Sequence, residues 1–169
     1  MKQLILFLLI LLMPIWASAQ QTLNPKFEKK IERLIAHSIP VISCERLEQK
    51  MSTPTLYLLD AREKKEFETS HLKDAVWVGY NTFSPKNLAS IPKDGIIVLY
   101  CSVGYRSEKI GEQLKKMGYS RVYNLYGGIF EWTNRAYPIV DQKNETTSKI
   151  HAYDQNWGRW LSKGEKVYK

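Results

Sequence analysis

Ile96-Ile97-Val98-Leu99-Tyr100-Cys101-Ser102-Val103-Gly104-Tyr105-Arg106-Ser107 is the stretch of sequence that decides the fold. Its first five residues are apolar or aromatic, a continuous run of the kind that forms a strand buried on both faces. After residue 107, Ile110, Leu114 and Met117 recur at spacings of four and three, which predicts one face of a helix. An acidic residue opens this helix and basic residues close it, as helix polarity requires: Glu108, Lys115 and Lys116. The stretch therefore predicts a buried strand, a short loop opened by Cys101, and a helix.

Cys101 is the residue of this loop that can carry chemistry. Backbone N–H groups between a strand end and a helix start lack partners within the helix and can converge on an anion such as a thiolate. Gly104 allows the loop to turn sharply, and Arg106 adds a permanent positive charge. The residues alone leave two interpretations open: a reactive thiolate, or a small apolar residue that ends a core strand beside a solvated arginine.

Residues 100–107 resemble the active-site loop of single-domain rhodaneses, which are sulfurtransferases. The resemblance continues downstream in Gly127-Gly128-Ile129 and Trp132, and upstream in Asp60-Ala61-Arg62, followed by Glu66-Phe67. Residues 70–75 resemble the Gly-His-Ile-Pro-Gly-Ala turn of that family. Ser70 replaces its first glycine and Lys73-Asp74 its Pro-Gly pair, which leaves the geometry of this turn open. The resemblance covers about residues 41–140 and rests on several motifs in matching order.

The resemblance implies an α/β fold, with a central parallel sheet of about five strands and helices on both faces. The residue pattern agrees, because short apolar runs alternate with helical segments. We expect strands at residues 41–42, 56–59, 75–78, 96–100 and 121–125, and a short helix around 86–90. Asp60, Arg62 and Cys101 then fall at carboxyl ends of strands, the edge where such sheets bind ligands.

The resemblance also implies a reaction. The Cys101 thiolate would attack the sulfane sulfur of a donor such as thiosulfate, and the resulting persulfide would pass its sulfur to cyanide or a thiol. The loop residues would bind the substrate: Ser102, Val103, Gly104, Tyr105 and Arg106. The implied partners are therefore a small anionic sulfur donor and a thiophilic acceptor. We expect no cofactor and no metal, since the sequence holds neither a Cys-x-x-Cys nor a His-x-x-x-His motif.

Two other functions remain open. The first is a phosphatase of the Cys-x5-Arg type, although only four residues separate Cys101 from Arg106, which makes a smaller cradle. The second is a rhodanese-like domain that binds a partner or senses thiols without catalysis. The presence of the cysteine favours the enzyme. Asp60 and Arg62 are expected to hold strand-end geometry, and His71 to stabilise a turn.

Residues 1–19 are typical of a signal peptide. Lys2 is followed by an apolar run from Leu4 to Met13, and Ala17-Ser18-Ala19 is a small-residue cleavage site. The run is shorter than the ~20 apolar residues of a comfortable membrane span. We therefore expect export to the periplasm or the exterior after cleavage near Ala19, with no stable membrane anchor. The net charge of +8 falls to +7 without Lys2. The basic residues form no cluster of the kind that binds nucleic acid, and export also argues against a nucleic-acid partner.

The remaining segments flank the domain. Residues 20–40 form an N-terminal extension with a helix predicted from Lys26 to His37 and ended by Pro40. Residues 141–169 form a polar linker and an aromatic tail, in which a helical stripe from Ile150 to Leu161 is expected to pack on the domain. A lesser alternative is that this tail helix binds a partner protein or a membrane surface. We expect Cys44, after the N-cap Ser43, to be an unpaired bystander.

Overall fold

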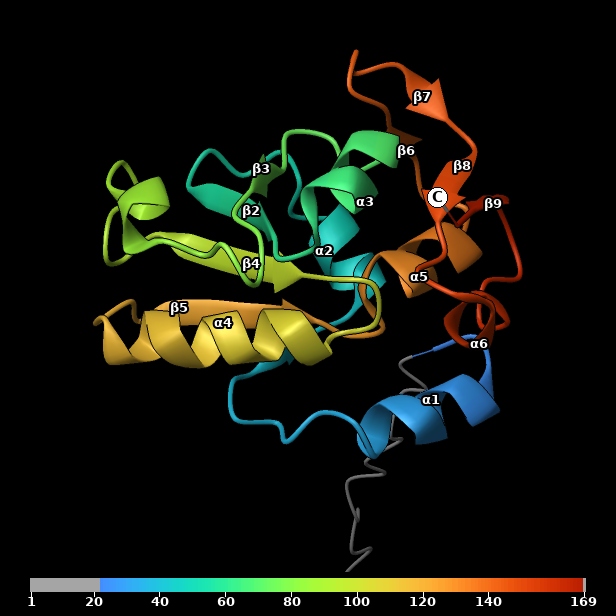
Figure 1. Ribbon diagram of the computed structural model, residues 1–169. Coiled ribbons are helices and arrows are strands. Elements are labelled where there is room, and N and C mark those ends of the chain that lie inside the picture. Colours follow the sequence, from blue (N-terminus) through green and yellow to red (C-terminus); the bar gives the residue numbers. More distant parts are fainter. Residues whose placement is uncertain (1–21, 169) are drawn as a thin grey trace, which may run out of the picture.

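A computed structural model describes residues 22–168, and Figure 1 shows its central sheet. The sheet has five parallel strands in the order β1-β5-β4-β2-β3, so β4 lies in the middle. The strands are β1 (Val41–Ile42), β2 (Leu56–Asp60), β3 (Val76–Trp77), β4 (Ile96–Tyr100) and β5 (Arg121–Leu125). This confirms the predicted α/β fold and all five strands, of which β3 is shorter and β2 one residue longer than expected.

Helices cover both faces of this sheet, and alternate residues of the strands point to each. Val98 packs in a core cluster with residues of α1, α2 and α5, whereas Leu99 packs in a second cluster with residues of α4. The helices are α1 (Pro25–Glu32), α2 (Cys44–Glu48), α3 (Lys64–Thr69), α4 (Tyr105–Lys116), α5 (Gly128–Asn134) and α6 (Gln155–Gly158), with a 3₁₀ turn, η1, at Pro85–Leu88. The helix predicted after the Cys101 loop is therefore confirmed as α4, and the short helix expected near residue 86 is a 3₁₀ turn.

The N-terminal helix is shorter than predicted. It begins at Pro25, where the Asn24 side chain caps it, but it ends at Glu32 rather than at His37. The next segment is bound to α4, because the N–H groups of Ala36 and Ser38 donate to the two carboxylate oxygens of Glu108, at 2.8 and 3.0 Å. Backbone N–H groups that bind a distant carboxylate in this way are not available to continue the helix.

The C-terminal segment is not the predicted helix. It forms β6 (Ile139–Val140) with β7 (Thr146–Thr147), then β8 (Lys149–His151) with β9 (Glu165–Val167), and only one helical turn, α6. Tyr153 has a φ of +65°, so the backbone leaves the helical region there, and Asp154 caps a new short helix.

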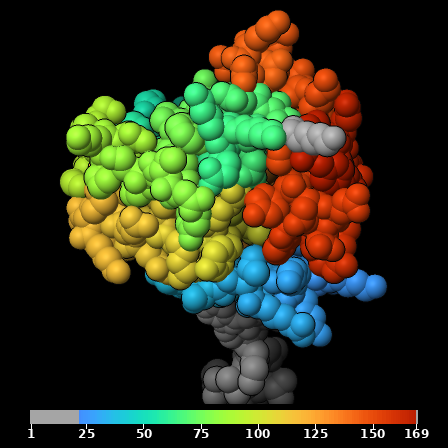
Figure 2. All heavy atoms as spheres, viewed as in Figure 1, coloured from blue at the N-terminus to red at the C-terminus, as the bar shows by residue number. Residues whose placement is uncertain are grey.

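The same segment nevertheless packs on the domain, as expected. Ile150 and Leu161 are buried in the core cluster that also contains Phe27, and the Trp160 ring stacks on Phe27 with ring centroids 5.5 Å apart. Figure 2 shows the C-terminal residues, in orange and red, packed beside the green residues and above the blue α1. The tail and the N-terminal helix thus share one core with the sheet.

The predicted signal peptide lies outside the described residues. In the part of the chain from 22 to 168, no helix has both the length and the apolar character needed to cross a bilayer.

Candidate active site

Cys101 directly follows the central strand β4, and the loop after it is closed around its sulfur. The N–H of Gly104 donates to Cys101 Sγ at 3.1 Å. Gly104 has a φ of +118°, a conformation that side-chain-bearing residues rarely adopt, and it is the N-cap of α4. The sulfur therefore lies at the start of a twelve-residue helix, where backbone N–H groups without partners in the helix can bind an anion.

The start of α5 supports the loop from behind. The N–H of Ile129 donates to Cys101 O at 2.9 Å, and the N–H of Phe130 donates to Ser102 O at 3.1 Å. In a trans peptide the C=O and the following N–H point in opposite directions, so these bonds turn the N–H groups of Ser102 and Val103 away from α5. Two loop peptides are thereby held in one orientation.

Strand β5 fixes the other end of the loop. The buried Asn124 side chain donates from Nδ2 to Gly104 O at 2.9 Å and accepts, at Oδ1, a hydrogen bond of 2.7 Å from Ser107 Oγ. Buried side-chain bonds of this kind leave little freedom for the loop backbone. The loop is therefore attached to α5 at its start and to β5 at its end.

A buried ion pair lies beside the loop. The Arg106 guanidinium donates to both carboxylate oxygens of Glu66, at 2.7 and 2.8 Å, and to Ser102 Oγ at 3.0 Å. Ser102 Oγ also donates to Glu66 Oε1 at 2.9 Å. Burial alone would raise the pKa of Glu66, but the hydrogen bonds and charge of Arg106, together with Arg62, lower it to about 2. The charge of Arg106 is thus largely offset by a carboxylate.

Asp60 and Arg62 form a second, fully buried ion pair at the end of β2. Arg62 Nη2 lies 2.6 Å from Asp60 Oδ2 and donates at 2.6 Å to Ser70 O. The predicted role in strand-end geometry is confirmed. His71 has a structural role as expected, with its ring stacked on Phe67 and its Nδ1 3.0 Å from Phe67 O, but its backbone forms an antiparallel bridge with Val140 and not a turn.

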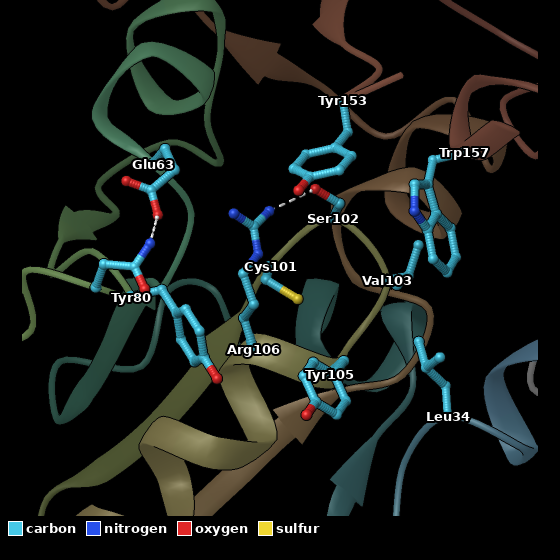
Figure 3. Close-up of a pocket in the computed structure, with 11 residues that line it drawn as sticks. Leu34, Glu63, Tyr80, Cys101, Ser102, Val103, Tyr105, Arg106, Tyr153 and Trp157 are labelled. Atoms are coloured by element: carbon cyan, nitrogen blue, oxygen red, sulfur yellow. Dashed lines mark hydrogen bonds between the residues drawn. The ribbon is translucent and has the colours of Figure 1, made fainter. Parts of the chain in front are cut away.

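Cys101 opens into a cavity of about 460 Å³, shown in Figure 3. Its lining is mainly aromatic and apolar, and includes no histidine among the described residues. The lining residues are Leu34, Glu63, Tyr80, Asn81, Cys101, Ser102, Val103, Tyr105, Arg106, Tyr153 and Trp157. Of the six residues predicted for the site, five line this cavity and the sixth, Gly104, binds the sulfur. No group of three or more potential metal ligands occurs between residues 22 and 168.

Several residues of the site were not predicted. Glu66 was named only as part of the family resemblance, and its partner Arg106 was expected to bind the substrate instead. Tyr153 and Trp157 come from the tail, about fifty residues beyond Cys101, where the apolar spacing predicted packing on the domain or, as a lesser alternative, contact with a partner protein or a membrane. Leu34, Tyr80 and Asn81 carry no signal in the sequence that would link them to a distant cysteine.

Cys44 lies apart from this cavity in the core of the domain. It is fully buried at the first position of α2, capped by Ser43 as predicted. Burial raises the pKa of its thiol to about 12. Both cysteines are free thiols.

The sequence of the described domain matches one protein family. The family defined as "Rhodanese-like domain" matches residues 43–135, more than half of the chain. The chain belongs to the rhodanese family. The matched range contains strands β2 to β5, the Cys101 loop and α5; it begins just after β1 and ends before Tyr153 and Trp157.

Two curated relatives of this rhodanese-like protein have names that refer to the transfer or carriage of sulfur. A sulfurtransferase of Allochromatium vinosum is 36% identical over 100 residues, which cover 59% of this chain and 92% of that protein. A putative sulfur carrier protein of Bacillus subtilis is 34% identical over 101 residues, which cover 59% of this chain but only 54% of that protein. A rhodanese-like domain protein from Staphylococcus aureus has a similar structure, with 26% identity, a TM-score of 0.52, and coverage of 63% of this chain and 97% of that one. The chain is therefore related to sulfurtransferases and sulfur carriers.

Proposed function

We propose that this protein is a sulfurtransferase that moves a sulfane sulfur from a donor such as thiosulfate to a thiol or to cyanide through a persulfide on Cys101. The observation that carries the proposal is the position of Cys101 Sγ, which faces the cavity and accepts the Gly104 N–H at the start of α4. Cys101 itself is only 1% exposed, so the cavity is the route by which a small donor would reach its sulfur.

The reaction has two displacement steps. In the first, the Cys101 thiolate attacks the outer sulfur of thiosulfate, the sulfur–sulfur bond of the donor breaks, and its electron pair leaves with sulfite. In the second, the acceptor attacks the outer sulfur of the persulfide, and the electron pair of the broken bond returns to Cys101 as thiolate. Atoms and charges balance without a cofactor.

The loop would stabilise the anion at each stage. The Gly104 N–H and the N-terminus of α4 are fixed before the donor arrives, so they need no reorganisation during the reaction. Arg106 would contribute mainly by holding Ser102 and the loop, because both terminal nitrogens of its guanidinium already donate to the Glu66 carboxylate.

Phosphate hydrolysis has less support. The loop between Cys101 and Arg106 has four residues, and a phosphate would have to compete with the Glu66 carboxylate for the guanidinium.

A thiosulfate:cyanide assay of the chain without residues 1–19 tests the proposal. We expect thiocyanate to form, Cys101→Ser to abolish it, and Cys44→Ser to leave it nearly unchanged. Mass spectrometry should find one added sulfur on Cys101 after incubation with thiosulfate alone. A folded, reduced protein that neither gains sulfur nor forms thiocyanate would favour the non-catalytic binding module.

The proposal includes export. Residues 1–19 would direct the chain across a membrane to the periplasm or the exterior, with cleavage near Ala19. N-terminal sequencing of the processed protein is expected to begin near Gln20. Recovery of a chain that retains Met1 in the membrane fraction would mean that the segment is an uncleaved anchor.

A further inference from the structure

The tail contributes an aromatic wall to the cavity, formed by Tyr153 and Trp157. Figure 3 shows the Tyr153 ring beside Ser102 and the Trp157 ring beside Val103, on the same side of the Cys101 loop. The Tyr153 ring centroid lies 5.5 Å from Arg106 Cζ. Both residues lie outside residues 43–135, the range that matches the family.

The aromatic wall is held in place before any ligand binds. Tyr153 has a φ of +65°, which is unfavourable for a residue with a side chain, and its N–H donates to His151 Nδ1 at 3.1 Å. The N–H of Trp157 is bound by the Asp154 carboxylate at 2.9 Å. Tyr153 is still 49% exposed, so its ring is not consumed by packing in the core. The unfavourable backbone conformation of Tyr153 costs stability, and its exposed ring adds little packing in return. Its position at the cavity is therefore better explained by ligand binding than by stability of the fold.

The rest of the cavity is also suited to an uncharged body. Leu34, Tyr80 and Tyr105 contribute apolar or aromatic surface to it. Arg106 is the one cation among the described lining residues, and it is paired with Glu66, while Glu63 adds a negative charge. A volume of about 460 Å³ is in the range of sites for small organic ligands and far exceeds the needs of cyanide.

We infer that the sulfur acceptor is a small organic thiol with an apolar or aromatic body, which packs on Tyr153 and Trp157 while its sulfur reaches the Cys101 persulfide. This inference rests on the proposed function. The acceptor loses its thiol proton to solvent, its thiolate attacks the outer sulfur, and the bond from that sulfur to Cys101 Sγ breaks. The products are an organic persulfide and the Cys101 thiolate.

The test separates binding of the body from sulfur chemistry. Protein without residues 1–19 is loaded with thiosulfate, freed of excess donor, and mixed with mercaptoethanol or phenylethanethiol, two alkyl thiols that differ in their bodies. We expect single-turnover transfer to phenylethanethiol to be faster by about tenfold or more at subsaturating thiol, the change expected when most of a phenyl group is buried. Phenylethanol, which lacks the thiol, should compete with phenylethanethiol.

The variants assign this preference to the wall. Tyr153→Ala and Trp157→Ala should each reduce the ratio of the two rates severalfold, whereas Tyr153→Phe should retain it. Tyr168→Ala is the matched control, since Tyr168 is an exposed tail tyrosine outside the cavity lining, and it should keep the wild-type ratio. Far-UV circular dichroism checks that each variant is folded.

The outcomes distinguish this inference from the proposed function. If Cys101 gains no sulfur from thiosulfate, the proposed function is wrong. If Cys101 is loaded but the two thiols react at equal rates, or if the folded wall variants keep the wild-type ratio, the sulfurtransferase stands and the apolar acceptor is wrong.

Discussion

Glu66 and Arg106 form a two-pronged ion pair, with N–O distances of 2.7 and 2.8 Å, that joins α3 to the first turn of α4. Both side chains also contact Ser102 Oγ, so the pair fixes the loop that carries Cys101. The side chains are only 3% and 15% exposed, which means that solvent screens the pair weakly. The Cys101 loop is therefore coupled to the ionisation of one carboxyl group.

This coupling predicts a loss of stability in acid. The pKa of Glu66 falls from 4.5 to about 2 on folding, so the unfolded chain binds the proton more readily. The stabilisation is complete above about pH 4.5 and is lost as the pH falls through about 2, a difference on the order of 3 kcal/mol. Urea unfolding at pH 7 and at pH 3 should show a smaller decrease for Glu66→Gln than for the wild type.

The control for this experiment is Glu68→Gln, an exposed carboxyl on the same helix that faces Lys64 at 3.8 Å. An exposed pair of this kind is expected to contribute less than about 1 kcal/mol. If the wild type and Glu66→Gln lose the same free energy between the two pH values, the ion pair does not govern acid stability.

The buried pair of Asp60 and Arg62 leads to a second prediction. Both side chains are fully inaccessible, and Arg62 makes three of its hydrogen bonds to Asp60 side-chain oxygens. Asp60→Asn leaves a buried guanidinium without its counter-charge and should lower the free energy of unfolding by about 3–5 kcal/mol. The exposed Asp74, with a φ of +63° that asparagine tolerates, provides the control Asp74→Asn, expected to change stability by less than about 0.5 kcal/mol.

The two cysteines should differ in alkylation. Cys101 is 1% exposed but lines the cavity, whereas Cys44 is buried in the core, away from the cavity, with a pKa of about 12. Iodoacetamide at neutral pH is therefore expected to modify Cys101 in the native protein and Cys44 only after unfolding, since the thiolate is the reactive form. Peptide mapping by mass spectrometry measures both. Equal rates at the two residues in native protein would show that the core around Cys44 opens readily.

Local patterns in the sequence predicted the centre of the fold. The strand before Cys101 and the helix after it follow from neighbouring residues, whose apolar runs, glycine and end charges all agree. The long-range contacts could not be read in the same way. Helix α1 ends early because its continuation binds Glu108, more than seventy residues away.

The site was predicted in part for the same reason. Its loop residues are contiguous with Cys101 and were found together, whereas Tyr153 reaches the cavity only because β8 and β9 pair and the backbone turns at a positive φ. The apolar period of the tail is compatible with a helix, and strand pairing between distant residues overrode it. Glu66 was visible in the sequence, but its pairing with Arg106 depends on the packing of α3 against the loop.

Gly128 gives the sharpest test of how closely α5 supports the Cys101 loop. Its φ is +56°, and a Cβ placed on it would lie 2.3 Å from Cys101 O and 2.7 Å from Ser102 O. Both are backbone atoms that cannot rotate away, so Gly128→Ala must displace the loop or break its bonds to the N–H groups of Ile129 and Phe130. We expect a loss of more than about 3 kcal/mol in unfolding free energy and a large loss of sulfur transfer.

Gly118→Ala separates the close approach from backbone strain. Gly118 also has a positive φ, +87°, but no atom lies within 4 Å of its added Cβ. This variant should lose only about 1–2 kcal/mol, the cost of the left-handed conformation, and should keep its activity because Gly118 ends α4 far from the loop. Urea unfolding and the thiosulfate:cyanide assay measure both variants. Equal losses in the two would mean that strain alone matters at Gly128, and that the contact between α5 and the carbonyl groups of the Cys101 loop is not what holds Cys101 in place.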